Sequence, residues 1–229
     1  MQEPGRERTR REEYTEATRQ ALLEAGRDAF ASEGYQAAGI EAISRAARVT
    51  RGAFYHHFED KKALFDAVVV ALQIEAAAKI EVRAKTQRKV WDRLTEGIDA
   101  YLDVCLEPAY ARIVIQEAPA VLGNARYREI EEAHPMPLLT ATLAALKRQG
   151  ELDFEDIDLL SRMVDAMICE MALLLPGAEN PKSSAPAGKR SSAVCSAPSA
   201  RLKSVRNASR LEPSLHGLRG VGQPESGVT

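Results

Sequence analysis

The chain has 229 residues, of which 45% are apolar, 28% charged and 5% aromatic, which is ordinary for a globular protein of one medium or two small domains. No run of about 18 apolar residues is present, and this excludes a membrane-spanning helix. The net charge of −2 is spread unevenly: residues 1–62 are balanced, residues 63–175 carry 12 Lys+Arg against 19 Asp+Glu, and residues 176–229 carry 8 against 3.

The N-terminus is charged throughout and has no apolar segment behind it, so a secretory signal is not expected. The three cysteines are too widely spaced for a metal or redox motif, and their number is odd. We therefore expect a cytoplasmic protein with no membrane partner, no metal and no cofactor.

Residues 1–62 are predicted to hold three helices behind a charged arm of 11 residues. Apolar positions recur at spacings of three and four, as on the inner face of a helix, and Gly34 is a typical helix stop. Thr50 can cap the third helix, because its hydroxyl can accept a hydrogen bond from a backbone N–H of the first turn. The predicted helices cover residues 12–33, 40–47 and 51–57.

The third of these helices is unusual in what it leaves outside. Phe54 and Phe58 lie four residues apart and can both face inward. The other face then carries small, hydrogen-bonding and cationic side chains, which suit the base edges and phosphates of a DNA major groove. A helical subdomain without a DNA role is the alternative, but surface helices more often carry Glu, Lys and Gln. Adjacent histidines at 56 and 57 point about 100° apart on a helix, which disfavours a metal site.

The rest of the chain up to residue 175 is also predicted to be helical. Asp60 is a good N-cap for a long helix that runs to about residue 83 with Leu64, Phe65 and Val68 inward. Prolines at 108, 135 and 137 mark new helix starts or breaks. Further helices are expected over residues 86–106, 138–149 and 157–175. Residues 176–229 are rich in Ser, Pro, Gly and Ala, and they are expected to be disordered because they can bury little apolar surface.

A first helix ending LLEAGRDAFASEGY, the pattern IxxIxxAAxVTRGxFYHHF and a following KKAL lie between about residues 19 and 70. In these motifs the chain resembles the tetracycline-repressor-like (TetR/AcrR) transcription regulators. The resemblance implies an all-α protein with a three-helix helix-turn-helix DNA-binding domain over 1–62 and a helical ligand-binding and dimerisation domain over 63–175. We therefore expect a one-component regulator, a repressor that a small apolar effector releases from a palindromic double-stranded DNA operator.

The resemblance also assigns roles to single positions. Residues that match base or groove contacts are Arg51, Gly52, Ala53 and His56. Residues that match phosphate contacts are Thr50, Tyr55, His57 and Lys61. Arg48 stands where the turn of the family usually has glycine, so we expect it at positive φ, at a cost of roughly 1 kcal/mol, with its guanidinium able to reach the DNA backbone.

In the second domain, apolar and aromatic residues are candidates to line an effector pocket, although such residues at helical spacing are more often simple core. The candidates are Trp91, Tyr101, Cys105, Tyr110, Phe154, Met163 and Met167.

The C-terminus leaves the oligomeric state open. Members of the resembled family usually end in two long helices that pair with a partner subunit, whereas here the low-complexity tail takes the place of the second one. A homodimer is the main expectation, and a dimerisation-defective or non-functional member is the alternative. An all-α carrier or enzyme is a weaker alternative, because no catalytic constellation stands out.

Overall fold

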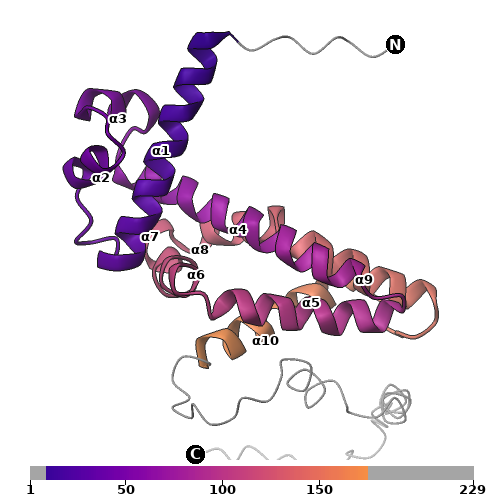
Figure 1. The fold of residues 1–229 in the computed structure, drawn as a ribbon. Helices are drawn as coiled ribbons and strands as arrows, with labels where there is room; N and C mark the ends of the chain where they lie inside the picture. Colours follow the sequence, from indigo (N-terminus) through magenta and orange to yellow (C-terminus); the bar gives the residue numbers. More distant parts are fainter. Residues whose placement is uncertain (1–8, 175–229) are drawn as a thin grey trace, which may run out of the picture. The chain divides into compact units, whose positions relative to one another are not determined.

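Helices account for the architecture of residues 9–174, the part of the chain that this computed structural model describes (Figure 1). No β-strand occurs within that range, so the predicted all-α class is confirmed. The elements are α1 (Arg10–Glu33), α2 (Ile40–Ala46), α3 (Arg51–His57), α4 (Lys61–Lys85), α5 (Val90–Cys105), α6 (Pro108–Tyr110), the π-helix η1 (Ala111–Glu117), α7 (Ala118–Leu122), α8 (Asn124–Ala133), α9 (Met136–Arg148) and α10 (Ile157–Leu174).

Helix α1 begins at Arg10, two residues earlier than predicted. A capping box explains the difference: the N–H of Glu12 donates to Thr9 Oγ1 at 3.3 Å, and the N–H of Thr9 donates to Glu12 Oε2 at 2.8 Å. The helix ends as expected before Gly34, whose φ of 87° favours glycine. The rest of the expected N-terminal arm, residues 1–8, lies outside the described residues.

Helix α3 rests on two buried aromatic rings, as the sequence predicts. Phe54 is fully buried, Phe58 is 5% exposed, and both belong to one apolar cluster with Ile43 of α2. The predicted cap is also present, since the N–H of Ala53 donates to Thr50 Oγ1 at 3.1 Å. The inner side of α3 is therefore fixed, and its other side is left to carry polar groups.

The turn between α2 and α3 passes through the left-handed region at Arg48, whose φ is 57°. The N–H of Arg48 donates to the carbonyl of Arg45 at 3.1 Å, and the N–H of Val49 donates to that of Ser44 at 2.9 Å. These two bonds form a Schellman motif, which ends a helix and is normally built with glycine. The predicted positive φ at Arg48 is confirmed.

Helix α4 connects the two predicted domains (Figure 1). Its N-cap is Asp60, as predicted, because its carboxylate accepts from the N–H of Ala63 at 2.7 Å. Its inner residues Leu64, Phe65 and Val68 are at most 1% exposed. They belong to a single apolar cluster that continues from α1–α3 to α5, η1 and α10. The expected boundary at residues 62/63 is therefore not a boundary in the packing.

The second half differs from the predicted helices in detail. Helix α5 starts at Val90, four residues later than expected, and the segment from Pro108 passes from an α-helical turn into the π-helix η1. Helix α9 starts at Met136, and it accommodates Pro137 because that proline lies in the first turn, where its missing N–H costs no hydrogen bond.

Helix α10 is buried on one side only. Ile168 is 6% exposed, but Met167, a predicted pocket residue, is 59% exposed. The outer face of α10 carries five exposed apolar residues: Leu159, Met163, Met167, Leu173 and Leu174. The expected disordered tail, residues 176–229, lies outside the described residues. None of the helices between residues 9 and 174 has the length and apolar character needed to cross a membrane.

Replacing Arg48 by glycine should raise the free energy of unfolding by about 1 kcal/mol, because glycine adopts its φ of 57° without a Cβ clash. Ala47→Gly is the matched control. Its φ is −72°, so glycine there adds unfolded-state entropy and removes a half-buried methyl group, and it should lower stability. Urea denaturation measures both changes, and equal losses in the two variants would contradict strain at Arg48.

Candidate nucleic-acid interface and effector cavity

Helix α3 turns most of its predicted groove contacts outward. Arg51, Gly52 and His56 are exposed, and Ala53 is half-buried. A Cβ added at Gly52 would meet nothing closer than Thr50 Oγ1, at 3.8 Å, so the backbone there is open to close approach. A short helix that packs on buried aromatic rings and exposes its other side has the form of a helix that reads a DNA groove.

Two side chains on this face already interact with each other. Arg51 Nη2 lies 3.5 Å from Tyr55 Oη, and the guanidinium carbon lies 5.7 Å from the Tyr55 ring. Arg51 also forms an ion pair with Glu41 of α2 at 2.8 Å. Both side chains of that pair are more than half exposed, so the pair is weak and readily exchanged for a DNA acceptor.

The two histidines differ in environment. His56 is exposed, whereas His57 is half-buried, and their ring centroids are 5.3 Å apart. Burial, followed by the neighbouring His56 ring, lowers the pKa of His57. Neutral imidazole is therefore favoured at His57, which can offer a hydrogen bond to a phosphate but little charge.

Lys61 is the first residue of α4, where the resemblance implies it, and its side chain binds backbone carbonyls. Its half-buried ammonium donates to the backbone carbonyls of Tyr35, Gln36 and Ala38 at 2.7, 3.2 and 3.0 Å, and it lies 4.6 Å from the Tyr35 ring centroid. All three of its donors are used in holding the loop between α1 and α2. The neighbouring Lys62 is exposed.

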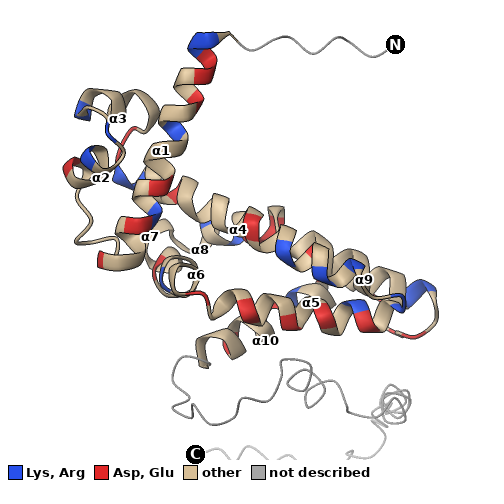
Figure 2. Ribbon diagram, in the orientation of Figure 1, with Lys and Arg blue, Asp and Glu red and all other residues tan. Residues whose placement is uncertain are grey.

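Positive charge around α3 is local. Arg48 and Thr50 are exposed beside the helix, and Figure 2 shows residues of both signs on α1 and α2. The interface therefore depends on a few placed cations rather than on a broad basic surface.

Two side chains of η1 hold the end of α1. Arg112 Nη1 donates to two carbonyls of the last turn of α1, at 3.1 and 2.8 Å, and Glu117 Oε2 accepts from the N–H of Tyr35 at 2.9 Å. A Cβ on Gly34 would lie 2.6 Å from Glu117 Oε1 and 2.7 Å from Arg112 Nη2. A polar clamp therefore joins the DNA-facing helices to the second half of the chain.

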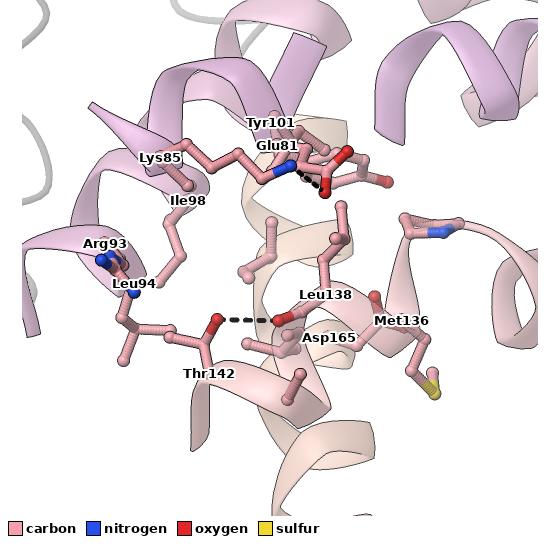
Figure 3. Close-up of a pocket in the computed structure, with 17 residues that line it drawn as sticks. Glu81, Lys85, Arg93, Leu94, Ile98, Tyr101, Met136, Leu138, Thr142 and Asp165 are labelled. Carbon is pink, nitrogen blue, oxygen red and sulfur yellow. Dashed lines mark hydrogen bonds and ion pairs between the residues drawn. The ribbon is translucent and has the colours of Figure 1, made fainter. Parts of the chain in front are cut away.

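A cavity of about 230 Å³ lies between α4, α5, α9 and α10 (Figure 3). Its wall is mostly apolar, with Leu94, Ile98, Leu138 and Ile168 among the lining side chains. A few polar groups are added by the Glu81–Lys85 ion pair and by Arg93, Thr142 and Asp165. A mostly apolar hollow with few polar groups is typical of a small-molecule site.

Of the seven expected pocket residues, Tyr101 lines this cavity. Cys105 and Tyr110 lie deeper in the core, where Tyr110 Oη donates to Gln73 Oε1 at 2.8 Å. Trp91, Met163 and Met167 are exposed and Phe154 is half-buried, and none of the four lines this cavity. Asp165 and Thr142 were not predicted from the sequence, because the wall combines four helices whose contacts no local spacing indicates.

Three potential cation ligands meet beside this cavity. One ligand atom from each of Glu131, Asp165 and Cys169 lies within 4.8 Å of the others. Burial raises the pKa of all three groups, that of Glu131 to about 7, and the nearby Asp165 carboxylate adds to the shift at Glu131. They line a second cavity of about 430 Å³, and Asp165 lines both cavities. No sequence motif marks this group, because it joins α8 to α10.

An exposed short helix lies behind a tight turn, and α4 connects it to a helical part with a mostly apolar cavity. This arrangement defines a helix-turn-helix DNA-binding protein with a sensor domain. Residues 22–68 match the tetR family of bacterial regulatory proteins, and residues 91–193 match the tetracyclin repressor-like C-terminal domain. The Tn10 TetC protein of Escherichia coli is 30% identical over 162 residues, 71% of this chain and 82% of that protein. The chain belongs to the tetR family of bacterial transcriptional regulators.

Solved structures agree with this assignment. A TetR-family transcriptional regulator from Pectobacterium atrosepticum is 29% identical, with a TM-score of 0.63 that covers 86% of this chain and 95% of that one. RolR in complex with resorcinol shares the fold at 18% identity, with a TM-score of 0.61 over 73% of this chain and 82% of its own.

Replacing Lys61 by methionine should lower the free energy of unfolding by about 2 kcal/mol, because three carbonyls lose a charged donor. The matched control is Lys62→Met, on the same helix turn but exposed, which should change stability by less than about 0.5 kcal/mol. Denaturation curves measure both. If the two variants were equally stable, the role of Lys61 in the loop would be wrong.

Proposed function

We propose that this protein is a cytoplasmic, homodimeric repressor that binds a palindromic double-stranded DNA operator and is released by a small, mostly apolar effector. The outward face of α3 is the observation that carries the proposal. Its apolar positions, Phe54 and Phe58, are buried, while the guanidinium of Arg51 and the hydroxyl of Tyr55 lie outside. Two such helices would enter successive major grooves, about 34–36 Å apart.

Within each half-site we assign direct contact with base edges to Arg51 and His56, while Gly52 and Ala53 allow the backbone to come close. Phosphate contacts fall to four residues beside or on the same helix: Arg48, Thr50, Tyr55 and His57. On this assignment Arg51 leaves Glu41 when DNA binds. Lys61 stabilises the α1–α2 loop beside the interface instead of contacting a phosphate.

The effector would occupy the cavity between α4, α5, α9 and α10. RolR, which shares the fold, was solved with resorcinol, a single-ring molecule, and a cavity of about 230 Å³ suits a ligand of that order. An effector can release DNA only if it binds the released conformation more tightly than the DNA-bound one. Helix α4 and the Arg112–Glu117 clamp are two routes by which a change at the cavity reaches α1–α3.

The outer face of α10 is the surface that supports a dimer. Leu159, Met163 and Met167 succeed one another at spacings of four and are each at least 50% exposed. A contiguous apolar helical face on a globular protein marks an interaction site, and a two-fold axis would pack it against its own copy.

The double variant Met163→Glu, Met167→Glu should convert a dimer of about 50 kDa into the 25.1 kDa chain, because unpaired carboxylates are costly in an apolar interface. Light scattering of the full chain measures the mass. The matched control is Val82→Glu, which replaces an apolar residue of α4 that is 68% exposed and should leave the mass unchanged. A wild-type mass near 25 kDa would instead favour the dimerisation-defective alternative.

DNA binding is tested by isolating fragments from random-sequence DNA with the full chain and comparing variants on them. Tyr55→Phe should weaken binding to all sequences by about 1 kcal/mol, as expected for one lost phosphate contact. Arg51→Ala should cost about 1–3 kcal/mol on the selected sequence and less on others, so specificity relaxes.

Glu41→Gln is the control, because it frees Arg51 without removing a proposed contact and should not weaken binding. Identical effects of the Tyr55 and Arg51 variants on every sequence would show that the assignment to phosphates and bases is wrong. A wild-type chain that retains no DNA at low salt would reject the proposed function and leave a carrier or an enzyme as the alternatives.

A further inference from the structure

Negative charge is uncompensated at one end of the cavity in Figure 3. Asp165 is half-buried, and no hydrogen bond or ion pair joins its carboxylate to any residue between 9 and 174. The carboxylate of Glu131, 8% exposed, lies within 4.8 Å of it. Like charges at this separation disfavour each other's ionised form, and a bound cation would relieve the repulsion.

The cationic side chains near this end are engaged elsewhere. Lys85 pairs with Glu81 at 2.7 Å, and Arg93 Nε donates to the carbonyl of Gln87 at 2.8 Å. Lys85 and Arg93 are both exposed, and they lie on the side of the cavity that α4 and α5 form. In the neighbouring second cavity, Arg162 pairs with Glu132 at 2.6 Å. The exposed Arg128 makes only the smallest contribution to the pKa of Glu131.

The remaining wall sets the shape and polarity of a ligand. Leu94, Ile98, Leu138 and Ile168 present hydrocarbon to the cavity, and the hydroxyl of Thr142 is occupied by the Leu138 carbonyl at 2.8 Å. An apolar cavity of about 150 Å³ is large enough to bind benzene. A cavity of about 230 Å³ therefore has room for one ring with a short chain.

We propose that this cavity binds a small apolar molecule that carries a protonated amine, with the ammonium against Asp165 and the apolar body among Leu94, Ile98 and Leu138. The inference names the chemical class of the effector and rests on the proposed function, in which this cavity holds that effector. Glu131 lines the second cavity and not this one, and its carboxylate beside Asp165 adds to the attraction for the ammonium.

A metal ion at Glu131, Asp165 and Cys169 is the competing occupant. Burial raises the pKa of the Cys169 thiol, and this opposes the thiolate that a metal ligand requires. Asp165, by contrast, also lines the mostly apolar cavity, which a metal ion bound to these three residues would leave empty. The organic cation is therefore favoured, and the metal becomes one outcome of the test.

Three probes of matched shape separate the alternatives: 3-phenylpropylamine, 3-phenylpropanol and 3-phenylpropanoate. Calorimetry on the full chain at neutral pH should give binding of the amine on the order of ten-fold tighter than of the alcohol or the acid, as expected for one charge-assisted contact. Asp165→Asn should abolish this preference, and Asp165→Glu should keep most of it. Asp158→Asn, the same change at an exposed residue of α10 that does not line the cavity, should leave the preference for the amine in place.

Tighter binding of the alcohol or the acid, or no binding of the amine, would overturn the assignment. Zinc binding that is lost in Cys169→Ala, without binding of the amine, would overturn it in favour of a metal site. Melting curves of each variant show that it is folded. The effector role is read separately, by retention of the selected DNA: amine binding that depends on Asp165 but leaves DNA bound would support the amine site and reject this cavity as the regulatory one.

Discussion

One continuous apolar core holds the DNA-facing helices and the cavity-bearing helices together, and α4 is the element on which it depends. Near its start, Phe65 packs edge-on against Phe30 of α1, with ring centroids 5.1 Å apart. The same helix supplies Ile80, Glu81 and Lys85 to the cavity wall further along the chain. Close-packed interiors transmit displacement instead of absorbing it, so a packed path joins the cavity to α3.

The clamp from η1 gives this coupling a second, polar route. Arg112 and Glu117 both bind the α1 terminus, and Gly34 leaves the space they need. Both residues lie in a π-helix, a geometry that recurs at functional sites. A shift in η1 would therefore move α1 directly, while a shift in α4 would move it through the core. A rigid domain joined at two points tilts more readily than it deforms.

Local signals were sufficient for the DNA-binding half and insufficient for the cavity. The Thr50 and Asp60 caps, the buried Phe54 and Phe58, and the positive φ of Arg48 each follow from neighbouring residues, and each is present. The bonds of Lys61 to the α1–α2 loop were not predicted, because its carbonyl partners lie more than twenty residues away in the sequence. The acidic end of the cavity was missed for the same reason on a larger scale: Asp165 and Glu131 are ordinary surface acids by spacing, and only the packing of α8 and α10 brings them together.

Helix α10 links the two proposals about the second half. Its inner side carries Asp165 at the cavity, and its outer side carries Met163 and Met167 at the proposed dimer face. Residues two positions apart point to different sides of a helix, so an ammonium drawn toward Asp165 would pull on the same backbone that contacts the partner. In a dimer, operator binding depends on the separation of two α3 helices as well as on the tilt of each. A cation at Asp165 can therefore act on both quantities through one helix, which a ligand held only by α4 and α5 could not do.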